Sequence, residues 1–235
     1  VSRVFAPREA PGQGHVVLAE AGTGVGKTMG YIAPASLWAE RNDGAVWIST
    51  YTKNLQRQID QELMRLYPDP VERAERVVIR KGRENYLCLL NYQESVGRAA
   101  LTGGREAIFL ALVARWIAAT RDGDFTGGDF PAWLFAREPV AFGLTDRRGE
   151  CTYAACPHYR RCFIERNVRA ATHATIVVAN HALVMSRAAL RARSLDDHEE
   201  EDDEAERIVF DEGHHIFDAA DGIFASHLTG YEGAE

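Results

Sequence analysis

A glycine-rich segment near the start of the chain has the residue types of a phosphate-binding loop. It reads AGTGVGKT and fits the pattern G-x-x-x-x-G-K-[ST], with Ala21 standing where the first glycine is usual. Glycines let backbone N–H groups converge on phosphate oxygens. Lys27 would reach the β- and γ-phosphates, and the Thr28 hydroxyl would ligate Mg²⁺. The loop therefore predicts a nucleotide site made by Gly22, Thr23, Gly24, Val25, Gly26, Lys27 and Thr28.

An acidic box follows an apolar run much later in the chain, where Asp211-Glu212-Gly213-His214-His215 comes directly after RIVF. Carboxylates at the carboxyl end of a parallel strand lie beside such a loop. Asp211 would hold Mg²⁺, mostly through water, and Glu212 would polarise the attacking water as general base. Alone the box would suggest a surface turn, but with the phosphate loop it predicts one Mg-nucleotide site with Lys27 and Glu212 as its catalytic groups.

Four cysteines lie between these two motifs, in the pattern C-x62-C-x4-C-x5-C: Cys88, Cys151, Cys156 and Cys162. Disulfides are rare in cytosolic proteins. Structural zinc favours C-x2–4-C pairs, which only Cys151 and Cys156 form. An iron–sulfur cluster also uses four thiolates and tolerates irregular loops. The spacing leaves zinc and a cluster both open, with unliganded cysteines as a further alternative.

Apolar runs and helical patterns alternate over most of the chain. Helices are predicted from Thr28 to about Arg41 and over Thr52–Leu66, and strands over His15–Glu20, Ala45–Thr50, Arg76–Arg80, Thr175–Ala179 and Arg207–Phe210. This alternation predicts an α/β fold with a parallel sheet covered on both faces.

The alternation breaks between about Lys81 and Asn167, in a segment with all four cysteines and a Gly/Asp-rich stretch at Arg121–Asp129. We interpret it as an insertion. The predicted organisation is a first part of the core at residues 1–81, an inserted, mainly helical domain at 82–166, the rest of the core with the acidic box at 167–220, and the start of a further region at 221–235.

The net charge of −7 is concentrated in one segment. Nine of the 34 acidic residues lie between Asp196 and Glu206, which leaves 25 against 27 Lys and Arg elsewhere. We expect a solvated loop there.

No apolar run is long enough to cross a bilayer, and no secretion signal precedes Ala10, so we expect a cytoplasmic protein that does not bind membranes. The chain does not begin with Met, and we expect it to be a fragment.

Taken in order, six segments resemble one known family. They are AEAGTGVGKT, STYTKNLQRQI, KGRENYLC, ECTYAACPHYRRC, VVANHAL and VFDEGHH. The set resembles the DinG/XPD-type iron–sulfur superfamily 2 DNA helicases, and within them the bacterial DinG branch. The resemblance extends from about Val16 to His215.

The resemblance implies a RecA-like P-loop NTPase motor domain with an inserted iron–sulfur domain. It implies that the four cysteines hold a [4Fe-4S] cluster, and that the protein uses ATP and Mg²⁺ to unwind single-stranded or forked DNA with 5′-to-3′ polarity. We expect it to act as a monomer.

Several residues become candidates for DNA contact through this resemblance. Ser49–Gln58 corresponds to a segment that contacts the DNA backbone, with Thr50, Lys53 and Asn54 as candidates, although Asn54 could instead cap a helix. Arg160, Arg161 and Arg166 could line the path of a strand or form a solvated basic face. Asn180 and His181 match a motif whose role is structural or DNA-facing.

The chain also departs from the family pattern. The second motor domain and its arginine finger are not present in these 235 residues, so we expect them alone to hydrolyse ATP slowly or not at all. The alternative hypothesis is a zinc-stabilised, nucleotide-dependent DNA-binding or scaffold module that does not unwind DNA.

Overall fold

A computed structural model describes residues 1–6, 15–22, 24–146, 151–196 and 206–225. The chain divides into two compact units, which are described separately. One contains Val1–Ile79 and His173–Glu235, and the other contains Arg80–Thr172.

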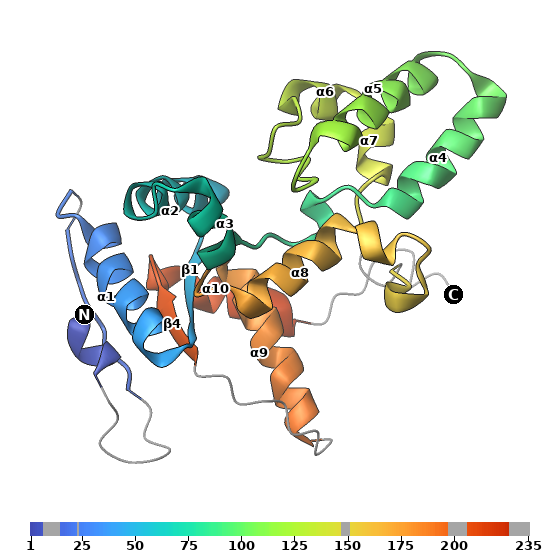
Figure 1. Ribbon diagram of the computed structural model, residues 1–235. Helices are drawn as coiled ribbons and strands as arrows, with labels where there is room; N and C mark the ends of the chain where they lie inside the picture. The colour runs from blue at the N-terminus through green and yellow to red at the C-terminus, as the bar shows by residue number, and fades with distance from the viewer. Residues whose placement is uncertain (7–14, 23, 147–150, 197–205, 226–235) are drawn as a thin grey trace. The chain divides into compact units, whose positions relative to one another are not determined.

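The first unit is built on a four-stranded parallel sheet (Figure 1). Its strands are β1 (Ala45–Thr50), β2 (Val77–Ile79), β3 (Ile176–Asn180) and β4 (Glu206–Phe210), in the order β2-β3-β1-β4. Ser49 of β1 is paired in register with Ala179 of β3 and Phe210 of β4. The carboxyl ends of these strands therefore meet at one edge, as an α/β fold predicts.

The helices of this unit are α1 (Lys27–Asn42), α2 (Lys53–Leu66), α3 (Pro70–Arg76), α9 (His181–Asp196) and α10 (Ile216–Phe224), with short 3₁₀ turns at Ser2–Phe5 and Gly213–His215. Thr52 caps α2, since its side chain accepts a hydrogen bond from the Leu55 N–H. Ile32, Ile48, Leu63 and Ile176 are fully buried in the core between helices and sheet. The helices and four of the five strands predicted in this unit are confirmed.

The strand predicted at His15–Glu20 is wrong. The segment pairs with no strand of the sheet, and Val16 and Leu18 are 86% and 96% exposed. An apolar run has strand potential, but it forms a strand only where a neighbouring strand accepts its backbone hydrogen bonds.

The second unit is mainly helical. Its helices are α4 (Leu89–Thr102), α5 (Arg105–Ala119), α6 (Ala132–Arg137), α7 (Pro139–Gly143) and α8 (Phe163–His173), and its 3₁₀ turns are Arg83–Asn85, Tyr153–Ala155 and Tyr159–Arg161. Its core is centred on Phe125, which is fully buried. Phe125 stacks on Trp116 at a centroid distance of 4.9 Å and meets Phe130 edge-on at 4.7 Å.

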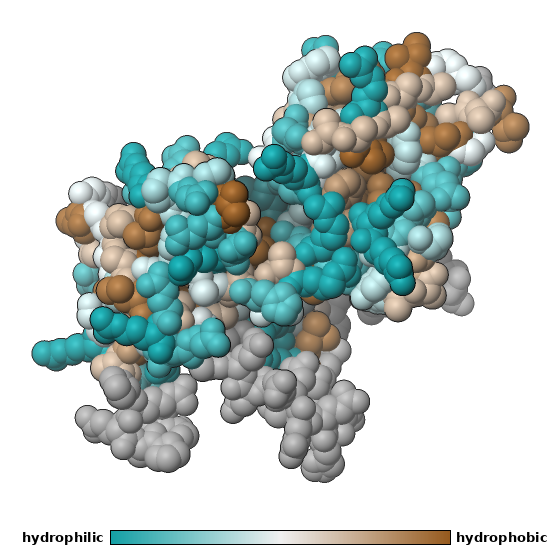
Figure 2. All heavy atoms as spheres, viewed as in Figure 1, coloured by the Kyte–Doolittle hydropathy of each residue, from teal (hydrophilic) through white to brown (hydrophobic). Residues whose placement is uncertain are grey.

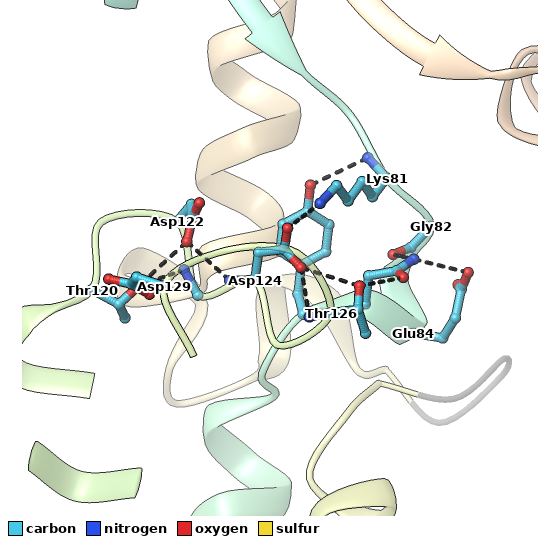
Figure 3. Close-up of polar contacts among 11 residues, drawn as sticks. Lys81, Gly82, Glu84, Thr120, Asp122, Asp124, Thr126 and Asp129 are labelled. Atoms are coloured by element: carbon cyan, nitrogen blue, oxygen red, sulfur yellow. Dashed lines mark hydrogen bonds and ion pairs between the residues drawn. The ribbon is translucent and has the colours of Figure 1, made fainter. Parts of the chain in front are cut away.

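The Gly/Asp-rich stretch is a tightly bonded loop of the second unit (Figure 3). The Lys81 ammonium pairs with the Asp124 carboxylate, which is almost fully buried. Asp124 N–H donates to the Asp122 carboxylate at 3.0 Å, and the Thr126 hydroxyl donates to Asn85 Oδ1 at 2.8 Å. Asp122 and Asp124 thus hold the loop in shape and tie it to the start of the unit.

The surface of the second unit carries several apolar side chains among polar ones (Figure 2). Leu101, Ile108 and Trp133 are 89%, 66% and 64% exposed. Over the described parts of the chain, no helix has the length and apolar character needed to span a bilayer.

Candidate nucleotide site and cysteine hollow

The phosphate loop leads directly into α1, which begins at Lys27. Gly24 and Gly26 have φ angles of 79° and 78°, a left-handed conformation that favours glycine. Gly22 and Val25 are exposed, and Thr23 lies outside the described residues. The free N–H groups at the start of α1 and its dipole would face an anion bound there.

Lys27 and Glu212 meet although 185 residues separate them in the sequence. Lys27 Nζ donates to Glu212 Oε1 at 2.8 Å. This hydrogen bond and the charge of Glu212 raise the pKa of Lys27, and the same bond lowers the pKa of the Glu212 carboxyl. Glu212 has a left-handed φ of 56°, a strained conformation for a residue with a side chain. The fold thus brings the two predicted catalytic groups together.

Asp211 lies directly after β4, and its N–H donates to the Ser49 carbonyl at 2.8 Å. Burial, followed by the neighbouring charge of Glu212, raises the pKa of its carboxyl. A cation beside Asp211 would favour the charged carboxylate and so oppose both causes of the raised pKa. The position is therefore suited to the predicted Mg²⁺ ligand.

Histidines and an aromatic ring surround this edge of the sheet. His181 is 1% exposed, and its Nδ1 lies 2.7 Å from Ser49 Oγ. Tyr51 stacks on His215 with a centroid distance of 3.8 Å. His214 is exposed beside Glu212. The buried position of His181 favours the structural alternative for this residue over a DNA-facing one.

Asn180 also has a structural role, because its Oδ1 accepts a hydrogen bond from the Leu183 N–H at the start of α9. Thr50, a candidate for DNA contact, is fully buried in the structure described, a position that does not favour such a contact. The reason is that β1 is a central strand covered on both faces. Lys53 and Asn54 are exposed, and Thr52 rather than Asn54 caps α2.

The four cysteines of the second unit line one hollow and form no disulfides. We call it the cysteine hollow; its wall consists of Arg83, Cys88, Leu89, Leu90, Asp146, Cys151, Tyr153, Cys156, His158, Tyr159, Cys162, Ile164 and Glu165. Cys88 is the N-cap of α4, and Cys162 directly precedes α8. Cys151 and Cys156 flank the turn at Tyr153–Ala155. Cys88, which precedes the other three cysteines by 63 positions or more, is thus gathered with them at one place.

The thiols of Cys88 and Cys162 are half-buried, and burial raises the pKa of both. Backbone N–H groups of the helix starts partly offset this rise in pKa. Such groups favour a thiolate, which is the form that binds metals. Within the described ranges, no three His, Cys, Asp or Glu side chains converge closely enough to hold a single metal ion.

Arg83 joins separate segments of the wall of the cysteine hollow. Its Nε donates to Asp146 Oδ2 at 2.5 Å, and its Nη1 lies 3.4 Å from Glu165 Oε1. Its guanidinium also lies 5.1 Å from the centre of the Tyr153 ring. Burial lowers the pKa of Arg83, but the hydrogen bond and the charge of Asp146, which is 3% exposed, raise it above its usual range. Arg160, Arg161 and Arg166 are exposed nearby in the sequence.

Sequence reasoning did not single out Tyr31, Ser49 or Arg83. Tyr31 follows Lys27 and Thr28 by one helical turn and is 7% exposed. Its helical spacing from Lys27 was a usable signal. The contacts of Ser49 and Arg83 depend on segments distant in sequence and left no local pattern.

Comparison with known proteins identifies relatives over nearly the whole chain. The ATP-dependent DNA helicase YoaA of Haemophilus influenzae is 32% identical over 89% of the chain, and the ATP-dependent helicase DinG of Mycobacterium tuberculosis is 31% identical over 92%. The chain is a homologue of the DinG-like helicases. A Bacillus subtilis relative, named 3′-5′ exonuclease DinG, is 28% identical over 97% of the chain.

The homologous region is a minor part of each DinG-like relative. The chain spans 31% of the YoaA sequence, 34% of the mycobacterial DinG and 23% of the Bacillus protein. No family model matches the chain.

Proposed function

We propose that the chain forms a nucleotide-binding motor domain of an ATP-dependent DNA helicase that moves 5′ to 3′ along single-stranded DNA. The pairing of Lys27 with Glu212 at 2.8 Å carries this proposal, because it joins the phosphate loop to the acidic box. The helicase names of the DinG and YoaA relatives support the activity and its dependence on ATP and DNA.

The proposed roles follow from position. The N–H groups of the loop and of α1 bind the phosphates, and Lys27 leaves Glu212 for the β- and γ-phosphates. Glu212 then orients and deprotonates the attacking water. Thr28 and Asp211 would hold Mg²⁺, which would supply positive charge beside the phosphates. Lys53 and Asn54, exposed at the start of α2, are the proposed contacts to the DNA backbone.

We also propose that Cys88, Cys151, Cys156 and Cys162 hold a [4Fe-4S] cluster near the DNA path. Four free thiols around one hollow fit such a group in number and chemistry. A cluster would supply a structural link between the turns that carry the thiols.

Two measurements test these proposals. The full-length protein should unwind a 5′-tailed fork in the presence of Mg-ATP and leave a 3′-tailed fork paired; the opposite preference would overturn the polarity. Protein purified without oxygen should be brown and contain iron and sulfide. Colourless protein with stoichiometric zinc would instead establish the alternative module.

A further inference from the structure

The hydroxyl of Tyr31 is buried, and in the described part of the chain it makes no hydrogen bond of ordinary geometry. The whole residue is 7% exposed. A buried hydroxyl without a partner costs free energy, so such a group calls for an explanation. Nothing in the packing of α1 requires an oxygen at this position, because phenylalanine would fill the same space.

The position of Tyr31 directs this hydroxyl toward the proposed Mg²⁺ site. Tyr31 follows Thr28 by three residues on α1, a spacing that puts both side chains on the same helix face. The Asp211 carboxylate is near enough for its charge to raise the pKa of the phenol, in addition to the larger effect of burial. Thr28 and Asp211 are the two residues proposed to hold the metal.

We propose that Tyr31 is a positioning residue for this metal site, and that its hydroxyl donates a hydrogen bond to the Asp211 carboxylate when Mg-nucleotide binds. The inference rests on the proposed nucleotide site. A carboxylate that binds a hydrated Mg²⁺ must keep one orientation, and a buried phenol is a rigid donor for it. In the described part of the free chain the hydroxyl lies beside Thr28 and Asp211 without a hydrogen bond of ordinary geometry, and in the loaded site it donates one to Asp211.

Magnesium-linked nucleotide binding tests this proposal without measuring turnover. A fluorescent ADP analogue is titrated into the chain in EDTA and at increasing Mg²⁺. In Tyr31→Phe the Mg²⁺ concentration for half-maximal tightening should rise about tenfold, the lower end of the effect of losing an outer-shell partner. Affinity in EDTA should stay the same, since the phosphate loop is unchanged.

Tyr67→Phe is the matched control. Tyr67 is 5% exposed in the same unit, and among the described residues its buried hydroxyl also has no hydrogen-bond partner of ordinary geometry. The charged groups that affect its pKa are Glu40, Arg76 and Glu72, not Asp211. Its Mg²⁺ dependence should match that of the unaltered chain. Equal Mg²⁺ dependence in Tyr31→Phe and Tyr67→Phe would overturn the proposal.

An Asp211→Asn background separates positioning from a loss of packing. If Tyr31 acts through Asp211, adding Tyr31→Phe to Asp211→Asn should change the Mg²⁺ dependence no further, whereas an additive loss contradicts the proposal. Circular dichroism of each variant verifies folding. If the unaltered chain bound no nucleotide, the proposed function would be contradicted. If the unaltered chain bound nucleotide but Tyr31→Phe left the Mg²⁺ dependence unchanged, only the role of Tyr31 would be contradicted.

Discussion

The two units gather their functional side chains by different means. In the first, Lys27 begins a helix and Asp211 follows a strand, so the backbone of regular elements sets their positions. In the second, the cysteines lie at helix starts and beside short turns, and Arg83 links the segments between them through Asp146 and Glu165. A sheet edge positions groups by hydrogen-bonded backbone, whereas the cysteine hollow depends on side-chain contacts and on whatever the thiols bind.

Loss of the Lys27 side chain is expected to give the largest change in nucleotide affinity. Lys27→Ala should weaken nucleotide binding by about tenfold to a hundredfold, the value of a hydrogen bond to a charged group. The iron content should stay the same, because the cysteines belong to the other unit. Isothermal titration with ADP and an iron assay on the same sample measure both effects.

Arg65→Ala is the control for this change, since it removes a 75% exposed positive charge from α2 of the same unit. Its nucleotide affinity should be unaltered. Equal losses in Lys27→Ala and Arg65→Ala would mean that general charge, rather than the phosphate loop, governs binding.

Cys162→Ser should have the converse effect. It replaces one proposed ligand by a similar shape, so iron and sulfide should be lost while ADP affinity is retained. Metal analysis and calorimetry again provide the two readings. If the iron content of Cys162→Ser were unchanged, Cys162 would not be a ligand of the cluster.

This contrast also explains how much the sequence could predict. The four strands and the helices α1 and α2 follow from local apolar patterns, and the proximity of Lys27 to Glu212 follows from parallel topology. The segment His15–Glu20 was misread because a strand depends on a neighbour that its own residues do not encode. The burial of Thr50 follows from its place in β1, a strand whose residues are buried on both faces. The contacts of Arg83 depend on residues distant in sequence, so no local pattern predicts them, whereas the spacing of Tyr31 from Lys27 on one helix is a local signal.

The core of the second unit offers a test of folding stability rather than of nucleotide affinity. Phe125→Ala leaves a cavity among stacked rings and should cost about 3–5 kcal/mol of unfolding free energy. Urea titration should show this loss in the unit that contains the cysteines, with nucleotide affinity unaltered. Phe142→Ala, at a 53% exposed position, is the matched control and should cost about 1 kcal/mol or less. A loss of nucleotide affinity in Phe125→Ala alone would show that the units are coupled.

The smallest expected effect concerns pH and His181. Burial lowers the pKa of His181, and His214 and His215 lower it further, while contacts with the backbone of Asp211 and Glu212 oppose them. The unfolded chain therefore takes up a proton near the usual histidine pKa of about 6.5 before the folded chain does. Stability from neutral His181 is present above that pH and is lost as the pH falls below it.

Replacing His181 by glutamine isolates this contribution, because the amide keeps a polar partner for Ser49 but does not titrate. The thermal midpoint of the unaltered chain should fall more steeply than that of His181→Gln between about pH 7.5 and 5.5. Asp211, whose raised pKa acts with the opposite sign, is present in both proteins and largely cancels in the difference. If the thermal midpoints of the two proteins changed with pH to the same extent, His181 would be as easy to protonate in the folded chain as in the unfolded chain. Burial at the sheet edge would then not lower its pKa.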